Sequence, residues 1–133
     1  MRRSLVMLGW FVACCAARAQ VSVVDDSGAT LRLAQPARRI VTLAPHLAET
    51  VFAAGAGDKL VGTVEFSDFP ETVKKLPKVG GYSRLDLEAI AALKPDLIIG
   101  WASGNAPAHI DKLRAFSFPV YISQPNQIGD VAD

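Results

Sequence analysis

The stretch Leu93-Lys94-Pro95-Asp96-Leu97-Ile98-Ile99-Gly100-Trp101 decides the fold class of this chain of 133 residues. A helical pattern ends where the stretch begins, and residues 96–100 then form a short apolar run. Such runs are typical of strands that are buried on both faces of a parallel sheet. Trp101 follows at the point where this strand would reach the edge of the sheet. We therefore predict a parallel sheet with an aromatic side chain at a strand end.

Strand and helix patterns alternate on both sides of this stretch. Residues 21–24 and 30–33 enclose a turn, Asp25-Asp26-Ser27-Gly28, and predict a β-hairpin in which the two aspartates are turn formers. Further strands are expected at residues 40–43, 60–64, 96–100 and 119–122, and helices at 47–54, from 71, at 86–93, at 108–116 and from 127. This order predicts an α/β domain with a mainly parallel sheet flanked by helices and preceded by a β-hairpin.

Single residues mark where helices begin, end and face the core. Gly55 is a helix stop, and Asp86 is a helix N-cap. The sequence Gly55-Ala56-Gly57 follows a helix and precedes a strand, which is the reverse of a dinucleotide-binding turn, so we reject nucleotide binding there. Ile110, Leu113 and Phe116 are expected on the inner side of their helix. Phe69, before Pro70, is expected to pack into the core.

The first nineteen residues read as a secretory signal peptide that is cut before Gln20. They contain Arg2 and Arg3, an apolar run at residues 5–13 and the small-x-small sequence Ala17-Arg18-Ala19. Lipidation at Cys14 is the alternative that we rank below plain cleavage. Cleavage removes three arginines and both cysteines, so 11 basic and 13 acidic residues give a net charge of −2. Without a basic run we expect no nucleic-acid partner, and without cysteines no disulfide.

Few residues have the spacing that catalysis or metal binding requires. His46 and Glu49 could hold a metal from one face of a helix, but His109 is remote and a zinc site needs at least three ligands. A partly exposed histidine near a helix start is the preferred interpretation of His46, and we expect no metal and no cofactor. The loop serines Ser67, Ser83 and Ser103 have no neighbouring base. The sequence therefore favours a binding protein over an enzyme.

Three aromatic residues in predicted loops are the candidate ligand contacts: Phe66, Tyr82 and Trp101. Ligands of open α/β sheets bind beyond the carboxyl ends of the strands. Flat aromatic rings at that edge offer rigid apolar area to a large ligand. We expect these rings to line one wall of a binding site.

At these residues the chain resembles the helical-backbone periplasmic binding proteins of ABC importers, which take up cobalamin, ferric siderophores and haem. The resemblance begins at Arg39 and is carried by a series of short pieces, among them residues 36–41, 43–45, 52–55, 61–62, 85–90 and 93–98. Phe66-Ser67-Asp68-Phe69-Pro70 and Trp101-Ala102-Ser103-Gly104-Asn105 resemble the cobalamin-binding members in particular. Phe66 stands where those members have tyrosine, and Tyr82 where they have tryptophan.

The resemblance implies a periplasmic, non-enzymatic and monomeric protein with two lobes that grip the ligand between them, of which residues 20–133 would be the N-terminal lobe. It implies that Phe66, Tyr82 and Trp101 contact the corrin face, and that Glu88 docks on arginines of the membrane permease. A single lobe should lose most of the binding free energy, so we expect weak or no cobalamin binding by this chain alone.

Three alternatives remain. The same fold could bind a ferric siderophore or haem, although the predicted loops are poor in cations for an acidic chelator, with Arg84 the exception. A flavodoxin-like redox domain would need a glycine turn after the first strand of the sheet, and residues 44–47 contain none. A zinc-binding relative would need more histidines than the two present.

Overall fold

A parallel sheet of four strands forms the centre of the molecule. The computed structural model describes residues 20–81 and 83–126. The strands lie in the order β4-β3-β5-β6, and all neighbouring pairs are parallel: β3 (Ile40–Thr42), β4 (Leu60–Gly62), β5 (Leu97–Trp101) and β6 (Val120–Ser123). The predicted α/β class and mainly parallel sheet are confirmed. No helix in the described part of the chain is long and apolar enough to cross a membrane.

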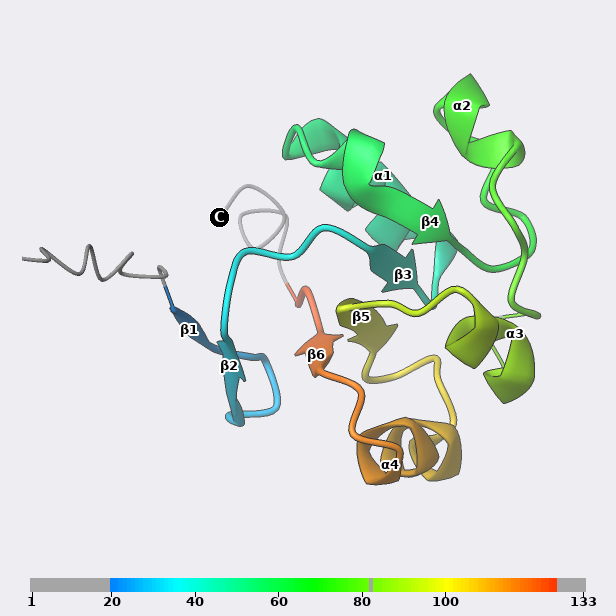
Figure 1. Ribbon diagram of the computed structural model, residues 1–133. Helices are drawn as coiled ribbons and strands as arrows, with labels where there is room; N and C mark the ends of the chain where they lie inside the picture. The colour runs from blue at the N-terminus through cyan, green and yellow to red at the C-terminus, as the bar shows by residue number, and fades with distance from the viewer. Residues whose placement is uncertain (1–19, 82, 127–133) are drawn as a thin grey trace, which may run out of the picture.

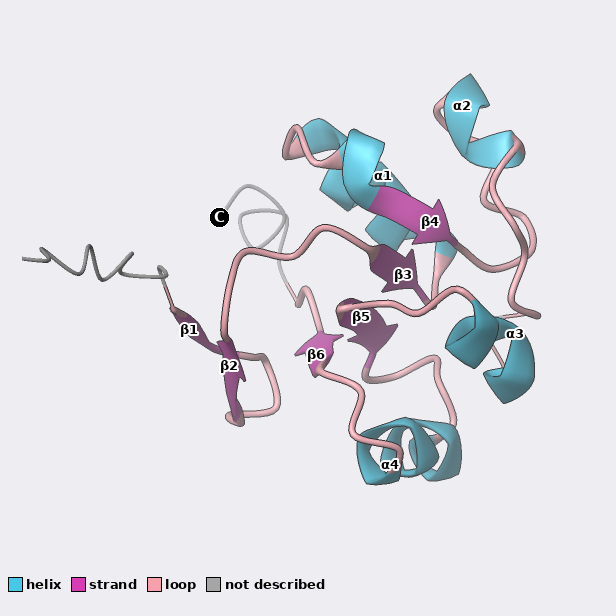
Figure 2. Cartoon of the chain, in the orientation of Figure 1, coloured by secondary structure: helices cyan, strands magenta, loops and turns pink. Residues whose placement is uncertain are grey.

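Helices cover both faces of the sheet (Figures 1 and 2). Helix α1 (Pro45–Ala53) lies above the sheet in this view, and α3 (Leu87–Ala92) and α4 (Pro107–Ala115) lie below it. The short element η1 (Gly57–Lys59) lies between α1 and β4, and α2 (Glu71–Lys74) lies between β4 and α3. Right-handed crossovers through helices are the usual way to join parallel strands, which explains why each strand pair here requires a helical connection.

Two apolar clusters, one on each face, hold the layers together. Ile98 of β5 packs with Ile90 of α3 and Leu113 of α4, all fully buried. On the other face Leu97 and Ile99 pack against the cluster that contains Ala48 and Val51 of α1. The side chains of β5 alternate between these two clusters, and this explains why its sequence is apolar throughout.

The predicted hairpin is confirmed, and its turn also joins it to the sheet. Strands β1 (Val21–Val24) and β2 (Thr30–Leu33) pair antiparallel. The buried Asp25 accepts hydrogen bonds from Ser27 and Ala29 within the turn, and from the Ile122 N–H of β6 at 3.1 Å. Burial acts to raise the pKa of Asp25, but these hydrogen bonds outweigh it and hold the pKa below its usual value. Asp25 therefore forms the turn and also links the hairpin to β6 by a hydrogen bond.

The ends of the helices largely follow their sequence signals. The side chain of Asp86 accepts a hydrogen bond from Ala89 N–H at 3.0 Å, so it caps α3 as predicted. Gly55 has a φ of 79° directly after the end of α1, a conformation that glycine adopts at little cost. Helix α1 begins at Pro45, two residues before the predicted start, because proline fits the first turn of a helix.

Three predictions differ from the structure. Strand β4 ends at Gly62, because residues 63–65 leave the sheet and bond with residues 77–80 instead. Phe69 is 67% exposed and so does not pack into the core. Phe116 is 63% exposed, since α4 ends at Ala115 and the helical spacing no longer applies to the next residue. The predicted signal peptide, Tyr82 and the predicted helix from residue 127 lie outside the described residues.

Candidate ligand-binding edge

Phe66 and Trp101 belong to the same edge of the sheet, where the parallel strands end. Phe66 lies in the turn that follows β4, and Trp101 is the last residue of β5. Because β3 lies between β4 and β5, the two strand ends are separated by two strand spacings, about 10 Å. We call this region, residues 63–67 and 101–105, the carboxyl edge. The third predicted contact, Tyr82, lies outside the described residues.

The turn that carries Phe66 is fixed from below by buried hydroxyl groups. Phe66 itself is 77% exposed and has a φ of 63°, in the left-handed region. The next residue, Ser67, is buried, and its hydroxyl lies 2.8 Å from that of Thr63, which accepts a hydrogen bond from the Thr42 hydroxyl. Lys78 donates to the Ser67 carbonyl from the other side. The exposed ring is thus presented by a turn with buried anchors.

Trp101 is positioned by the loop that follows it. The buried side chain of Asn105 accepts a hydrogen bond from the Trp101 N–H at 2.7 Å and donates one to the Leu43 carbonyl at 2.9 Å, so it joins the ends of β5 and β3. A Cβ atom at Gly104 would overlap the benzene ring of the indole. The half-buried indole therefore lies flat against a backbone that only glycine allows to approach so closely.

His46 of α1 contacts the same indole. The two ring centroids are 5.0 Å apart and the ring planes meet at 82°, which is an edge-to-face arrangement. His46 is half-buried, and its Nε2 is buried without a hydrogen-bond partner in the described part of the chain. Burial lowers the pKa of His46, and the nearby Glu49 carboxylate opposes this shift only in part.

The arrangement suits binding of a flat, apolar ligand face. The described residues contain no group of three or more side chains that could hold a metal ion, so His46 and Glu49 do not form part of such a group there. Ser67, one of the loop serines, uses its hydroxyl in the buried chain with Thr63. The edge instead offers rings whose positions are set by the backbone and by buried polar groups.

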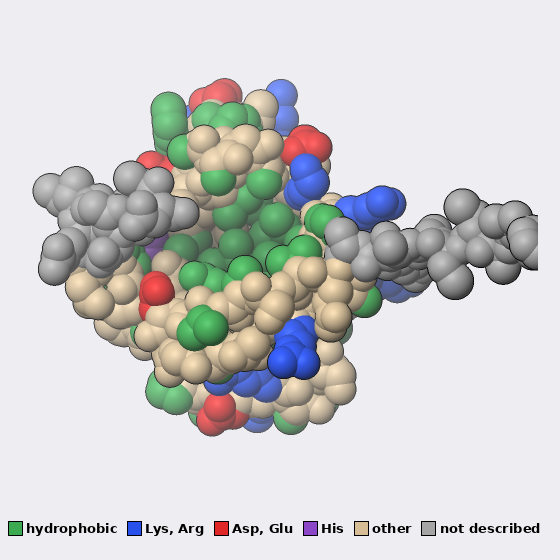
Figure 3. Space-filling view, turned by 90° about the vertical axis from the view of Figure 1, so that its left-hand side faces the viewer, with side chains coloured by type: hydrophobic (Ala, Val, Ile, Leu, Met, Phe, Trp, Pro, Cys, Tyr) green, Lys and Arg blue, Asp and Glu red, His purple; other side chains and the backbone are tan. Residues whose placement is uncertain are grey.

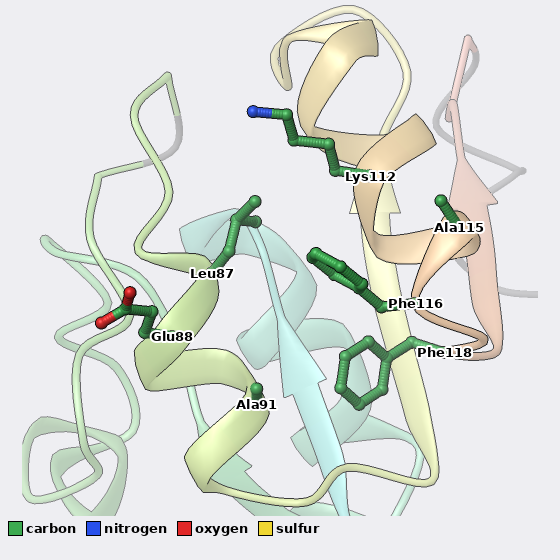
Figure 4. Close-up of a pocket in the computed structure, with 7 residues that line it drawn as sticks. All are labelled: Leu87, Glu88, Ala91, Lys112, Ala115, Phe116 and Phe118. Carbon is green, nitrogen blue, oxygen red and sulfur yellow. The ribbon is translucent and has the colours of Figure 1, made fainter.

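Glu88 lies apart from the carboxyl-edge rings, on α3, and is exposed as predicted. It lines one wall of a groove of about 640 Å³ between α3 and α4 (Figure 4). In this view the rings of Phe116 and Phe118 project toward α3, whereas the Glu88 carboxylate points away from them. Glu88 therefore offers its charge to solvent next to an apolar surface.

The face of the molecule on the left-hand side of Figure 1 has an apolar hollow of its own. Figure 3 shows hydrophobic side chains gathered at the centre of that face, between the α1 side of the molecule above and the α4 side below. Half-buried side chains on the α1 face of β5 and β6, such as Ile99 and Tyr121, agree with a sheet that is covered less fully there than on the α3–α4 face.

Sequence reasoning missed the residues that position the rings. Asn105 belongs to a motif that we had singled out, but nothing in the sequence shows that its amide reaches Leu43, 62 residues away. The contact between His46 and Trp101 was likewise missed. The one available signal was that Trp101 ends one strand and His46 comes four residues after the end of the neighbouring strand, at the same edge of a parallel sheet.

Comparisons with known proteins agree with this geometry. Residues 40–133 match the family described as periplasmic binding protein. A vitamin B12-binding protein of Vibrio vulnificus (strain CMCP6) is 48% identical over 100 residues, which are 75% of this chain and 37% of the relative.

Solved structures show the same likeness. The periplasmic vitamin B12 binding protein BtuF of Vibrio cholerae superposes with a TM-score of 0.71 at 46% identity, over 74% of this chain and 38% of that chain. The periplasmic heme-binding protein RhuT from Roseiflexus sp. RS-1 has a TM-score of 0.62 at 34% identity, over 67% and 34% of the two chains. The chain thus spans less than two fifths of the length of these relatives.

Proposed function

Because this chain belongs to the periplasmic binding protein family, we propose that it supplies one wall of a cobalamin site in an ABC importer. The observation that carries the proposal is the pair of anchored aromatic residues, Phe66 and Trp101, at the carboxyl edge. Parallel α/β sheets bind their ligands at this edge. A corrin ring is large and largely flat, so two aromatic rings at one edge of the sheet could both lie against it.

The identities of the relatives favour cobalamin over haem. The B12-binding relatives share 42–48% of aligned residues with this chain, whereas heme-binding structures share 34% or less. A haem site would also need an iron ligand, and His46 is the histidine nearest to Trp101. Its Nε2 is buried against neighbouring atoms instead of open to a ligand, which speaks against iron coordination in this conformation. Haem remains the second candidate ligand.

The proposal includes export of the chain to the periplasm and delivery of the ligand to the permease. Residues 1–19 would be a signal peptide that directs the chain to the periplasm, where residues 20–133 form the N-terminal lobe and act as a binding protein without enzymatic activity. Glu88 would dock on cationic side chains of the permease, because it is exposed, at the first turn of α3 and beside an apolar groove. Mass determination of the exported protein would distinguish cleavage before Gln20 from lipidation at Cys14.

A ligand titration followed by amide NMR spectra tests the binding proposal on the 133-residue chain. With cyanocobalamin we expect shifts confined to the carboxyl edge and a Kd of about 0.1–1 mM, since one wall should supply only some 4–5.5 kcal/mol. With haemin we expect smaller shifts. Cobalamin shifts centred on α3 and α4, tight cobalamin binding by this chain alone, or stronger binding of haemin would each contradict the proposal.

A further inference from the structure

His46 is held at the start of α1, and its ring packs against Trp101. It is the second residue of α1, directly after Pro45, and its carbonyl accepts a hydrogen bond from the Thr50 hydroxyl at 2.9 Å. The helix therefore fixes its backbone. Its side chain meets the indole edge to face at 5.0 Å. Edge-to-face ring pairs are attractive beyond their buried area, so the imidazole adds to the packing that orients the half-buried indole.

The buried Nε2 makes this contact depend on the charge of the imidazole. A neutral imidazole has one N–H donor and one acceptor nitrogen, whereas the charged ring has two donors. Nε2 has no hydrogen-bond partner in the described part of the chain. Leaving a neutral polar group unpaired in a buried position costs free energy, and placing a charged one there costs more. The buried position is therefore compatible with the neutral ring and poorly compatible with the imidazolium.

We propose that His46 is a positioning residue for Trp101, which holds the indole at the carboxyl edge while uncharged and releases it on gaining a proton. The proton would move the imidazole toward solvent, because Nε2 has no hydrogen-bond partner in the described part of the chain and water would accept its N–H. The indole would then lose the ring that packs on it from α1. The relevance to ligand binding rests on the proposed role of Trp101, but the ring contact itself does not.

Glu49 is the charged neighbour that acts on the protonation of His46 in the described part of the chain. On α1 the Glu49 carboxylate attracts the proton, but burial outweighs it and the pKa of His46 stays below its ordinary value. Strands β3 and β5, which pack against α1, carry no titratable side chain. Asp58 and Lys59 of η1 follow the opposite end of α1 and pair with each other at 3.5 Å. Release of the indole is therefore expected below the ordinary histidine pKa of about 6.5.

Tryptophan fluorescence tests the proposal without any ligand. The chain has two tryptophans, Trp10 and Trp101, so the full chain with Trp10→Phe reports on Trp101 alone. We expect one reversible change in its emission as the pH falls from 8 to 4.5, with a midpoint below about 6.5. In the same background His46→Gln should abolish the change. His46→Phe, which keeps a ring without a titratable nitrogen, should give an emission that does not depend on pH.

His109→Gln is the matched control, because Nδ1 of His109 is also buried without a hydrogen-bond partner among the described residues, but His109 lies on α4. It should leave the change intact. Persistence of the change in both His46 variants, its loss in His109→Gln, or a change that coincides with loss of far-UV circular dichroism would overturn the proposal. As no ligand is used, these results refute or support the role of His46 separately from the cobalamin titration.

Discussion

The backbone of Phe66 allows folding stability to be separated from ligand binding. Its φ of 63° lies in the left-handed region, where a residue with a Cβ atom pays roughly 1–2 kcal/mol. Its ring is 77% exposed, so truncation removes little buried area. Glycine relieves the strain, but its greater freedom in the unfolded chain lowers the folding stability by about 0.4–1 kcal/mol relative to alanine. We therefore expect Phe66→Gly to be more stable than Phe66→Ala by up to about 1.6 kcal/mol.

Ligand binding should respond differently, because both substitutions remove the ring. If cobalamin covers about 80 Å² of the exposed ring, the loss at 25 cal/mol per Å² is about 2 kcal/mol. Ordering costs reduce this figure, so we expect affinity to fall by about 10- to 30-fold in both variants. Urea unfolding measures the first effect, and the NMR titration with cyanocobalamin measures the second.

Phe116→Ala is the matched control, since Phe116 is exposed to a similar degree, 63%, but lies at the end of α4. It should leave the cobalamin affinity unchanged. The reasoning about strain fails if Phe66→Ala proves more stable than Phe66→Gly. The reasoning about the ligand fails if the Phe66 variants bind cobalamin as well as Phe116→Ala does.

Two further predictions concern the residues that hold the carboxyl edge and the hairpin. Asn105→Ala should destabilise the fold by about 2–4 kcal/mol, because it removes two buried hydrogen bonds. Hydrogen exchange at the Trp101 N–H should then become faster. An unchanged urea midpoint would contradict this prediction. Asp25→Asn should lower stability at neutral pH. The pKa of Asp25 is lower in the folded state than in the unfolded state, so its contribution to stability is complete above the unfolded-state pKa and is lost as the pH falls through the folded-state pKa. The urea midpoints of the two proteins should therefore converge below about pH 4. A difference in midpoint that stays constant from pH 7 to pH 3 would count against this.

The order of strands and helices could be predicted because local signals and tertiary structure agree. The apolar run before Trp101 indicated a strand covered on both faces, and both faces are covered. Gly55 and Asp86 act on their own helices through local backbone geometry, so their roles could be recognised without knowing the rest of the fold. Such features involve residues only a few positions apart.

The two wrong placements show where this reasoning stops. Phe69 and Phe116 are apolar and lie beside buried elements, yet both are exposed. Each lies just outside a helix, at a position where neither the period of 3.6 nor the period of two determines which way a side chain points. Residue type alone then decides the prediction, and an apolar type does not imply burial, because much of a protein surface is itself apolar.

The same reasoning explains why the rings of the carboxyl edge could be predicted and their supports could not. Phe66 and Trp101 stand out in the sequence as aromatics after strands, whereas their supports are common polar residues whose partners are distant. Ser67 bonds to Thr63 of the same turn, but Thr42, at the far end of this hydroxyl chain, comes 21 residues before Thr63.

These supports also determine how the edge can change. Since the ring of Phe66 is exposed and its turn is held by Ser67 beneath it, another ring can replace it at little cost to folding. A substitution at Ser67 or Asn105 would instead disturb buried hydrogen bonds and move the ring. Ligand preference at this edge should therefore vary through its exposed rings, while the buried polar residues that place them stay fixed.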